Sequence, residues 1–254
     1  MVLLDVRNIS KRFGGLQAVK AVSFVVEQGM IKAVIGPNGA GKTTLFNLLS
    51  GFLLPDTGTI LFNGEPIHGR PPYQAAARGL ARTFQHIKLF SQMTALENVM
   101  VGCHVWSRAG FLAGMLHLPR TWQEEREIRE SAHDLMDFFG VASLADIEAT
   151  SLSYGQQRAV ELARACAAEP TMLLLDEPAA GLNMRETADI ARLILKIRDR
   201  GVTVLIVEHD MSLVMNISDE IIVLSYGEKI ADAKPGSIQK NPDVVRVYLG
   251  EDDA

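Results

Sequence analysis

The sequence predicts an α/β fold with a mixed, largely parallel central sheet, a flanking antiparallel β layer and an inserted helical subdomain. Three apolar runs, residues 31–35, 172–175 and 202–207, are typical of parallel strands that are buried on both faces. Residues 59–62 followed by Asn63-Gly64 indicate a β-hairpin, and therefore an antiparallel layer. A change to helical patterning after about Met93 indicates the insertion.

Length and composition narrow the class of protein. The chain has 254 residues, of which 48% are hydrophobic and 22% charged, as in an ordinary globular protein. A formal net charge of −5 provides no broad basic surface, so we expect no nucleic-acid partner. Only Cys103 and Cys166 are present, which favours a reducing cytosol over a disulfide framework. The sequence shows no secretory signal or membrane-spanning run, so we expect a soluble chain that reaches a membrane only through another protein.

The N-terminal third is predicted to be rich in strands. Residues 2–9 and 22–26 are β-branched runs, and we expect them to pair across a loop that holds Phe13-Gly14-Gly15. Further on, residues 81–84 predict a brief strand, which places Gln85 in the loop that follows it.

The middle of the chain, from about Met93 to Cys166, is predicted to be helical. Thr94 and Glu97 have the spacing of a capping box, so a helix should begin there. Residues 106–122 are apolar but too short to span a membrane. We favour a loop and helix packed on their own domain for this segment, over an apolar patch that docks a partner.

The C-terminal third returns to the α/β pattern after Pro170. A helix is predicted by i, i+3, i+4, i+7 spacing at Ile190, Leu193, Ile194 and Ile197. Asn241-Pro242 suits the N-cap and first position of a last helix through Leu249. We expect one domain, 1–254, composed of a core with its β layer (1–85 and 170–254) and a helical subdomain (about 86–169).

A phosphate-binding loop is predicted between the strand at residues 31–35 and the next helix. Its sequence fits G-x-x-x-x-G-K-[ST], and a chance match has odds on the order of one in a hundred at ordinary composition. Glycines let successive N–H groups point inward to cradle phosphate oxygens, and the helix N-terminus adds its positive dipole end. Lys42 should neutralise the β- and γ-phosphates, and the Thr43 hydroxyl should bind Mg²⁺. The candidate nucleotide-binding residues are Gly36, Pro37, Asn38, Gly39, Ala40, Gly41, Lys42, Thr43 and Thr44.

Two carboxylates, Asp176 and Glu177, follow the apolar run 172–175. Ligands of α/β sheets bind at the carboxyl ends of the strands, which places both acids beside the phosphates. Asp176 can hold Mg²⁺ through its water shell, and Glu177 can orient and polarise the attacking water. An ordinary strand-end turn explains Asp-Glu-Pro equally well when the motif is considered alone.

A second candidate anion site opens a later helix. Ser153 and Gln156 again have capping-box spacing, and Gly155 lies in the first turn. A hydroxyl, a glycine and a helix N-terminus together suit an anion. Because one chain already has a phosphate loop, a second such site suggests that two chains share each nucleotide.

These motifs, in this order and over essentially the whole chain, resemble the ATP-binding cassette (ABC) ATPases, the nucleotide-binding subunits of ABC transporters. The family's signature sequence Leu-Ser-Gly-Gly-Gln corresponds to Leu152-Ser153-Tyr154-Gly155-Gln156, with Tyr154 in place of the first glycine. The resemblance implies the P-loop NTPase fold of ABC ATPases, with ATP and Mg²⁺ bound in a dimer. Ser153, Gly155 and Gln156 would then meet the ATP held by the partner chain.

The resemblance also implies roles for single residues. Gln85 matches the Q-loop glutamine, which links the core to the helical subdomain, and His209 matches the switch histidine that contacts the γ-phosphate. Residues 179–183 occupy the D-loop, with Asn183 where an aspartate is commoner. Phe13 fits the aromatic position that stacks on adenine, with a packed loop aromatic as the alternative. The expected catalytic residues are Glu177, His209 and Gln85, and the expected Mg²⁺ ligands are Thr43, Gln85 and Asp176.

The chain further resembles the LivG-type ATPases of branched-chain amino acid uptake systems in four segments, 154–158, 179–183, 208–215 and 241–250. This resemblance implies a second ATPase chain, identical or different, and transmembrane permease subunits whose coupling helices dock near Gln85. It also implies an indirect partnership with a substrate-binding protein, and a peripheral position on the cytoplasmic face of the membrane. Two alternatives stay open: the ATPase of an exporter such as lipopolysaccharide export, and a soluble ABC ATPase that serves no transporter.

Overall fold

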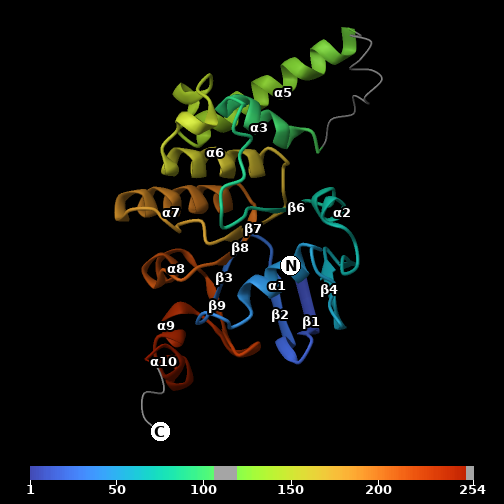
Figure 1. Cartoon of the computed structure of the whole chain (residues 1–254), viewed down its shortest axis with the longest axis vertical. Coiled ribbons are helices and arrows are strands. Elements are labelled where there is room, and N and C mark those ends of the chain that lie inside the picture. The colour runs from blue at the N-terminus through green and yellow to red at the C-terminus, as the bar shows by residue number, and fades with distance from the viewer. Residues whose placement is uncertain (106–118, 250–254) are drawn as a thin grey trace.

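The computed structural model describes residues 1–105 and 119–249 (Figure 1). The expectation for residues 106–122 lies outside this description, apart from the first residues of helix α5 (Pro119–Phe138). None of the helices in the two described ranges combines the length and the apolar character that crossing a membrane requires.

A six-stranded sheet forms the centre of the fold. Its order is β10-β9-β3-β8-β7-β6, and all neighbours are parallel except the β9–β10 hairpin at the edge. The strands are β3 (Ile31–Ile35), β6 (Leu80–Arg82), β7 (Met172–Asp176), β8 (Thr203–Val207), β9 (Glu220–Ser225) and β10 (Glu228–Ala233). The predicted strand at residues 81–84 is therefore real but ends at Arg82.

An antiparallel sheet packs beside this core, in the order β2-β1-β4-β5. Its strands are β1 (Val2–Phe13), β2 (Leu16–Glu27), β4 (Thr57–Phe62) and β5 (Glu65–Pro66). The predicted pairing of the first two strands and the hairpin at Asn63-Gly64 are confirmed. Both long strands extend past their β-branched runs, so Phe13 ends β1 instead of lying in the loop. Backbone pairing continues through exposed polar residues, which carry no hydrophobic signal.

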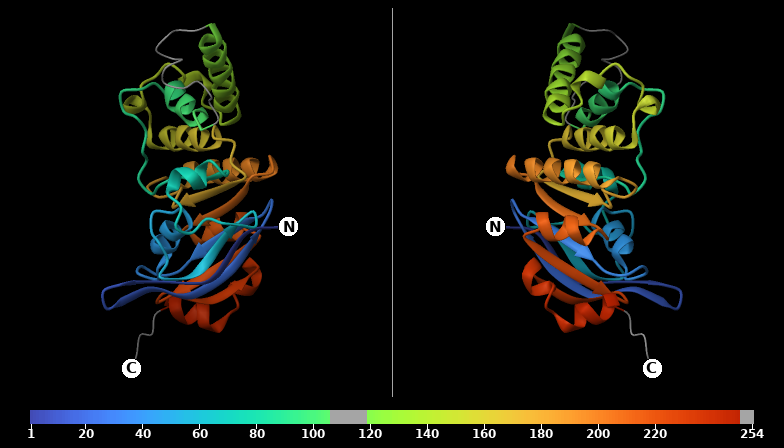
Figure 2. Two further views of the ribbon diagram at one scale, coloured as in Figure 1. Left: turned by 90° about the vertical axis from the view of Figure 1, so that its right-hand side faces the viewer. Right: turned by 90° about the vertical axis from the view of Figure 1, so that its left-hand side faces the viewer.

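Helices cover the two sheets and form a separate layer above α7 (Figures 1 and 2). In chain order they are α1 (Lys42–Leu49), α2 (Pro72–Ala76), α3 (Ala95–Cys103), α5, α6 (Tyr154–Cys166), α7 (Met184–Asp199), α8 (Met211–Ile217), α9 (Pro235–Ile238) and α10 (Pro242–Leu249). Short 3₁₀ turns at Ala142–Leu144 and Ala149–Ser151 join α5 to α6. The capping box at the start of α3 is confirmed, because the Glu97 N–H donates to Thr94 Oγ1 at 3.2 Å and the Thr94 N–H to Glu97 Oε2 at 2.8 Å.

Two hydrophobic cores lie on opposite faces of the six-stranded sheet. Ile31 and Ile35 of β3 belong to the core shared with α3, α6 and α7, whereas Val34 belongs to the core shared with α1 and the antiparallel sheet. The same alternation occurs at Leu173 and Leu174 in β7. Burial on both faces is the physical reason why these strands are apolar throughout.

Candidate functional site

The turn between β3 and α1 is shaped by its glycines. Gly36 and Gly41 have φ angles of 151° and 101°, in the region that favours glycine. A Cβ on Gly36 would lie 2.2 Å from the Leu224 carbonyl oxygen, and one on Gly41 would lie 2.3 Å from the Ala18 carbonyl oxygen. Gly41 is also the N-cap of α1 and offers no capping side chain, so the first-turn N–H groups face the loop. The loop therefore has the geometry that suits an anion.

Lys42, the first residue of α1, folds back over this turn. Its Nζ donates to the carbonyl oxygens of Gly36 at 2.6 Å and Pro37 at 3.0 Å. The residue is only 8% exposed. Burial lowers the pKa of Lys42, and the negative charge of Glu177 opposes that shift. Both side chains line the same pocket.

Glu177 follows β7 in a left-handed backbone conformation, with φ 48°. Such a conformation is strained for a side chain of this size and is often found at functional sites. The Glu177 N–H donates to the Val207 carbonyl oxygen at 2.9 Å, which ties the residue to the end of β8. Gln85 Nε2 donates to Glu177 Oε2 at 2.8 Å, and His209 Nδ1 lies 3.6 Å from the same oxygen. The three residues expected to be catalytic are thus brought together.

A pocket beside the turn collects many of the predicted nucleotide-binding residues. Phe13 is one of them and is 47% exposed, with Lys11 Nζ 5.8 Å from the ring centroid. Because about half of the residue is exposed, part of the ring remains accessible to a stacking partner. The predicted residues that line the pocket are Phe13, Asn38, Gly39, Ala40, Gly41, Lys42, Thr43, Thr44, Gln85 and Glu177.

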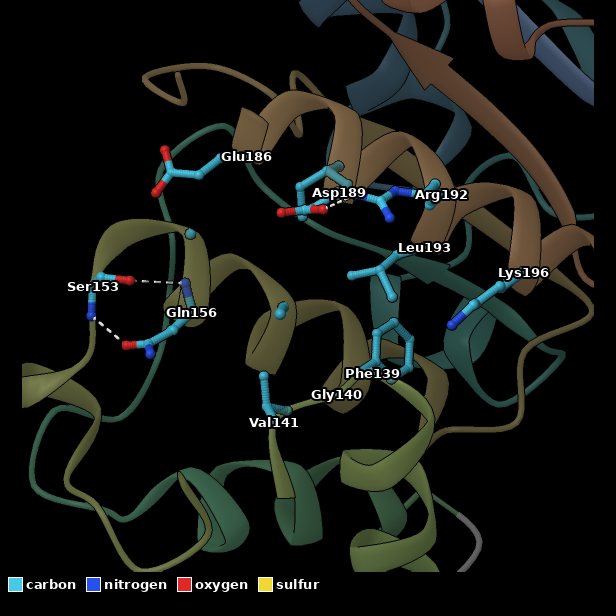
Figure 3. A pocket seen from close by; sticks show the side chains of 13 residues that line it. Phe139, Gly140, Val141, Ser153, Gln156, Glu186, Asp189, Arg192, Leu193 and Lys196 are labelled. Carbon is cyan, nitrogen blue, oxygen red and sulfur yellow. Dashed lines mark hydrogen bonds and ion pairs between the residues drawn. The ribbon is translucent and has the colours of Figure 1, made fainter. Parts of the chain in front are cut away.

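The signature segment lies elsewhere, over a hollow between α6 and α7 (Figure 3). The predicted capping box is confirmed, because the Gln156 N–H donates to Ser153 Oγ at 3.4 Å and the Ser153 N–H to Gln156 Oε1 at 2.9 Å. Gly155 faces Glu186 of α7, whose Oε1 would lie 3.0 Å from an added Cβ. Ser153, Gly155 and Gln156 line this hollow, and they are absent from the lining of the pocket at Lys42.

Comparisons with known proteins agree with this arrangement. The sequence matches the family described as ABC transporter over residues 19–180, and that described as branched-chain amino acid ATP-binding cassette transporter over residues 228–254. It is 47% identical over 250 residues to BraF of Pseudomonas aeruginosa, and 44% identical over 250 residues to LivG of Escherichia coli K12. Both relatives are named high-affinity branched-chain amino acid transport ATP-binding proteins, and 98% of each chain is covered. The chain belongs to the ABC transporter ATP-binding family.

Solved structures of ABC cassettes have the same fold. A nucleotide-free ATP-binding cassette matches with a TM-score of 0.86 and 34% identity, covering 99% of this chain and all of the other. The ADP conformation of the cassette MJ1267 gives the same values. A dimeric post-hydrolysis state of the cassette MJ0796, bound to ADP and Pi, matches with a TM-score of 0.77 and 25% identity over 92% of this chain and 99% of the other. The predicted ABC ATPase fold is therefore confirmed.

The structure of this ABC cassette also reveals a charged partner of Asp176 that sequence reasoning missed. Arg82, at the end of β6, forms an ion pair with Asp176 Oδ2 at 2.8 Å. The same guanidinium donates to Asn47 Oδ1 at 2.8 Å and to Ser50 Oγ at 2.6 Å, both near the end of α1. It also lies 5.2 Å from the ring centroid of Phe84. Asp176 is thereby oriented by a cation that sits between β6, β7 and α1.

A second residue of the cassette that sequence reasoning missed is Glu208. Its side chain is fully buried and accepts the N–H groups of Ala179 at 2.8 Å and His209 at 3.1 Å. Burial raises the pKa of Glu208, and these backbone hydrogen bonds oppose the shift. The backbone at Ala179 and at His209 is thus held by one carboxyl group. A polar residue directly after an apolar strand was the only sequence signal for it.

The D-loop asparagine has a clear structural use in this family member. Asn183 is the N-cap of α7, and its Oδ1 accepts the N–H groups of Arg185 and Glu186, both at 3.0 Å. Asparagine and aspartate are equally good at this position, so the replacement keeps the helix start intact.

Proposed function

We propose that this chain is the ATP-hydrolysing subunit of an ABC importer for branched-chain or related apolar amino acids. The supporting observation is its similarity, over 98% of both chains, to BraF and LivG, which are named for branched-chain amino acid transport. The match of residues 228–254 to a family described by the same cargo adds to it. These relatives support neither lipopolysaccharide export nor a role apart from transport.

The working unit in this proposal is a dimer. The signature segment at Ser153 and the phosphate loop at Lys42 line separate hollows of one chain, so Ser153 needs a second chain to meet a nucleotide. The dimeric MJ0796 cassette is a precedent within the family. Each ATP is then held between the loop of one chain and residues 153–156 of its partner, which is identical or a second ATPase of the same system.

ATP and Mg²⁺ fit the residues of the pocket. The loop N–H groups and Lys42 hold the phosphates, and Phe13 stacks on the base. Mg²⁺ prefers oxygen ligands, and the Thr43 hydroxyl and the Gln85 amide oxygen of the pocket would supply them. Asp176 lies outside the pocket lining with one carboxylate oxygen paired to Arg82, so it would hold the ion through the ion's water shell. In Gln85 the amide nitrogen already donates to Glu177, so its oxygen is the atom that remains for a cation. When bound, Mg²⁺ neutralises phosphate charge.

Hydrolysis depends on Glu177 in this proposal. Its carboxylate accepts a proton from water as that water attacks the γ-phosphorus atom. The bond between the γ-phosphorus and the β,γ-bridging oxygen breaks, and ADP is the leaving group. Gln85 and His209 both lie near the Oε2 atom of Glu177, and Gln85 orients the carboxylate through its hydrogen bond. Release of phosphate removes the contacts that hold the two chains together, so the dimer opens.

Coupling to a membrane requires a docking place for the permeases. A largely apolar cleft beside the Q-loop is lined by Phe52, Tyr73, Phe84, Phe90 and Val105, and also by Lys88 and Arg164. Exposed apolar clefts of this kind commonly bind helices of partner proteins. We propose that the permease coupling helices dock here, which places the chain on the cytoplasmic face of the membrane and links it indirectly to a substrate-binding protein.

A reconstituted transporter tests the proposed function. The chain is incorporated with its genomically neighbouring permeases into liposomes, and ATP hydrolysis is measured with the substrate-binding protein loaded with leucine, loaded with histidine, or unloaded. We expect leucine to stimulate hydrolysis most. A complex that hydrolyses ATP at the same rate in all three states would refute the proposed cargo.

A further inference from the structure

Arg158 is a fully buried cation in α6 that donates hydrogen bonds to backbone outside its own helix. Its Nη1 donates to the Phe84 carbonyl oxygen at 3.0 Å, and its Nη2 donates to the Gln85 carbonyl oxygen at 2.9 Å. Its charge is balanced by Glu161, at 2.7 Å and only 2% exposed. Glu161 in turn accepts the Lys88 N–H at 3.3 Å. The Q-loop backbone is therefore held to α6 at three points.

The buried Arg158–Glu161 pair is better explained by the positions that it gives to the Q-loop backbone than by a contribution to the free energy of unfolding. A buried ion pair contributes little net stability, because desolvation of both groups offsets their attraction. A guanidinium, however, presents several donors in one rigid plane, so it can hold two neighbouring carbonyl oxygens at defined positions. Arg158 uses this property at the backbone of Gln85, the residue that contacts Glu177.

The same guanidinium contacts the signature segment. Its Nη2 lies 3.4 Å from the Tyr154 hydroxyl oxygen, and its Cζ lies 5.8 Å from the centroid of the Tyr154 ring. Tyr154 in turn packs against the D-loop, since a Cβ added to Gly181 would lie 3.3 Å from Tyr154 Cε1. Arg158 thus joins the Q-loop and the start of α6, and it reaches the D-loop through Tyr154.

We propose that Arg158 is a positioning residue that makes the Q-loop of one ATP site and the signature segment of the other move together. The proposal rests on the shared-site dimer of the proposed function. In that dimer, Gln85 serves the ATP of its own chain, whereas Ser153 serves the ATP of the partner chain. A displacement at one site is then transmitted to the other through a single buried side chain.

A linked dimer with one working site tests this proposal. One chain carries Glu177→Gln, so that only the site with an intact Glu177 hydrolyses ATP, and single-turnover hydrolysis is measured. R158M is placed either in the chain that supplies Gln85 to the working site or in the chain that supplies Ser153. We expect the rate constant to fall by on the order of 10- to 100-fold in both arrangements, as a displacement of about 1 Å allows. A loss in only one of the two arrangements would overturn the proposal.

A buried cation elsewhere provides the control for stability. Lys32 is 1% exposed and forms ion pairs with Glu220 at 2.9 Å and Asp232 at 2.7 Å, away from the Q-loop. We expect Lys32→Met to lower the unfolding temperature without changing the rate constant, measured below both unfolding temperatures. We also expect Arg158→Lys, which keeps the charge but loses the planar fork, to recover stability and not rate. Equal rate losses in the Lys32 and Arg158 variants would refute the positioning role.

Two results separate this proposal from the proposed function. A parent dimer that neither forms with ATP nor hydrolyses it contradicts the shared-site model itself. A parent dimer that works, with a rate constant that R158M leaves unchanged in both arrangements, contradicts only the role of Arg158.

Discussion

Replacement of Glu177 by glutamine separates ATP binding from hydrolysis. Glutamine has nearly the same shape, and its Oε1 can still accept the hydrogen bond that Gln85 Nε2 now donates at 2.8 Å. The geometry around Lys42 should therefore persist, while the ability to accept a proton from water is lost. A positioned general base contributes roughly 10²–10⁴-fold to a rate, so we expect the turnover number to fall by that factor.

Phosphate release measures turnover, and a fluorescent ATP analogue measures binding. We expect the dissociation constant of the Glu177→Gln variant to stay within about threefold of the parent, because binding contacts are unchanged. Its dimer should accumulate with ATP in size-exclusion chromatography. Glu65→Gln is the matched control, since the Glu65 side chain is 67% exposed and should leave turnover unchanged. Full turnover in the Glu177 variant would refute its role as the base, and a strict monomer at saturating ATP would refute the shared site.

Three further changes probe the loop, the thiols and a buried carboxyl group. Gly41→Ala should abolish binding of the ATP analogue, because the added Cβ would lie 2.3 Å from the Ala18 carbonyl oxygen. Retained affinity would contradict this expectation. Burial raises the pKa of Cys103 to about 11 and that of Cys166 to about 12. Neither thiol should therefore react with iodoacetamide at pH 8 until urea unfolds the chain, which mass spectrometry can measure. Burial also raises the pKa of Glu208, so the carboxyl group stabilises the fold below its ordinary pKa of 4.5, and this stabilisation is lost as the pH rises. The unfolding temperature of the Glu208→Gln variant should therefore increase relative to that of the parent between pH 4.5 and pH 7. A difference in unfolding temperature that does not change with pH would contradict this.

Local sequence signals predicted the elements that position the site. The apolar run at residues 172–175 predicted β7, because a strand buried on both faces has no polar positions to obscure it. The capping boxes at Thr94 and Ser153 were also predicted, since they depend on residues three apart on one chain segment. The glycine-rich turn before Lys42 was predicted for the same reason.

Long-range contacts could not be predicted in the same way. Arg82 and Asp176 are 94 residues apart, and Arg158 reaches Gln85 across 73 residues. A charged residue in a helix is usually exposed, and no neighbouring residue in the sequence indicates that Arg158 is buried. Glu208 was missed because its partners are main-chain N–H groups, which have no sequence signature. Long-range packing determines these contacts.

The backbone hydrogen bonds of Lys42 bear on how little the loop must reorganise when it binds an anion. The ammonium has three N–H donors, and two of them already donate to carbonyl oxygens at 2.6 and 3.0 Å. The third donor can therefore reach a phosphate oxygen without the loss of either bond. Because the backbone already holds this long side chain in place, ordering it costs little conformational entropy when an anion binds.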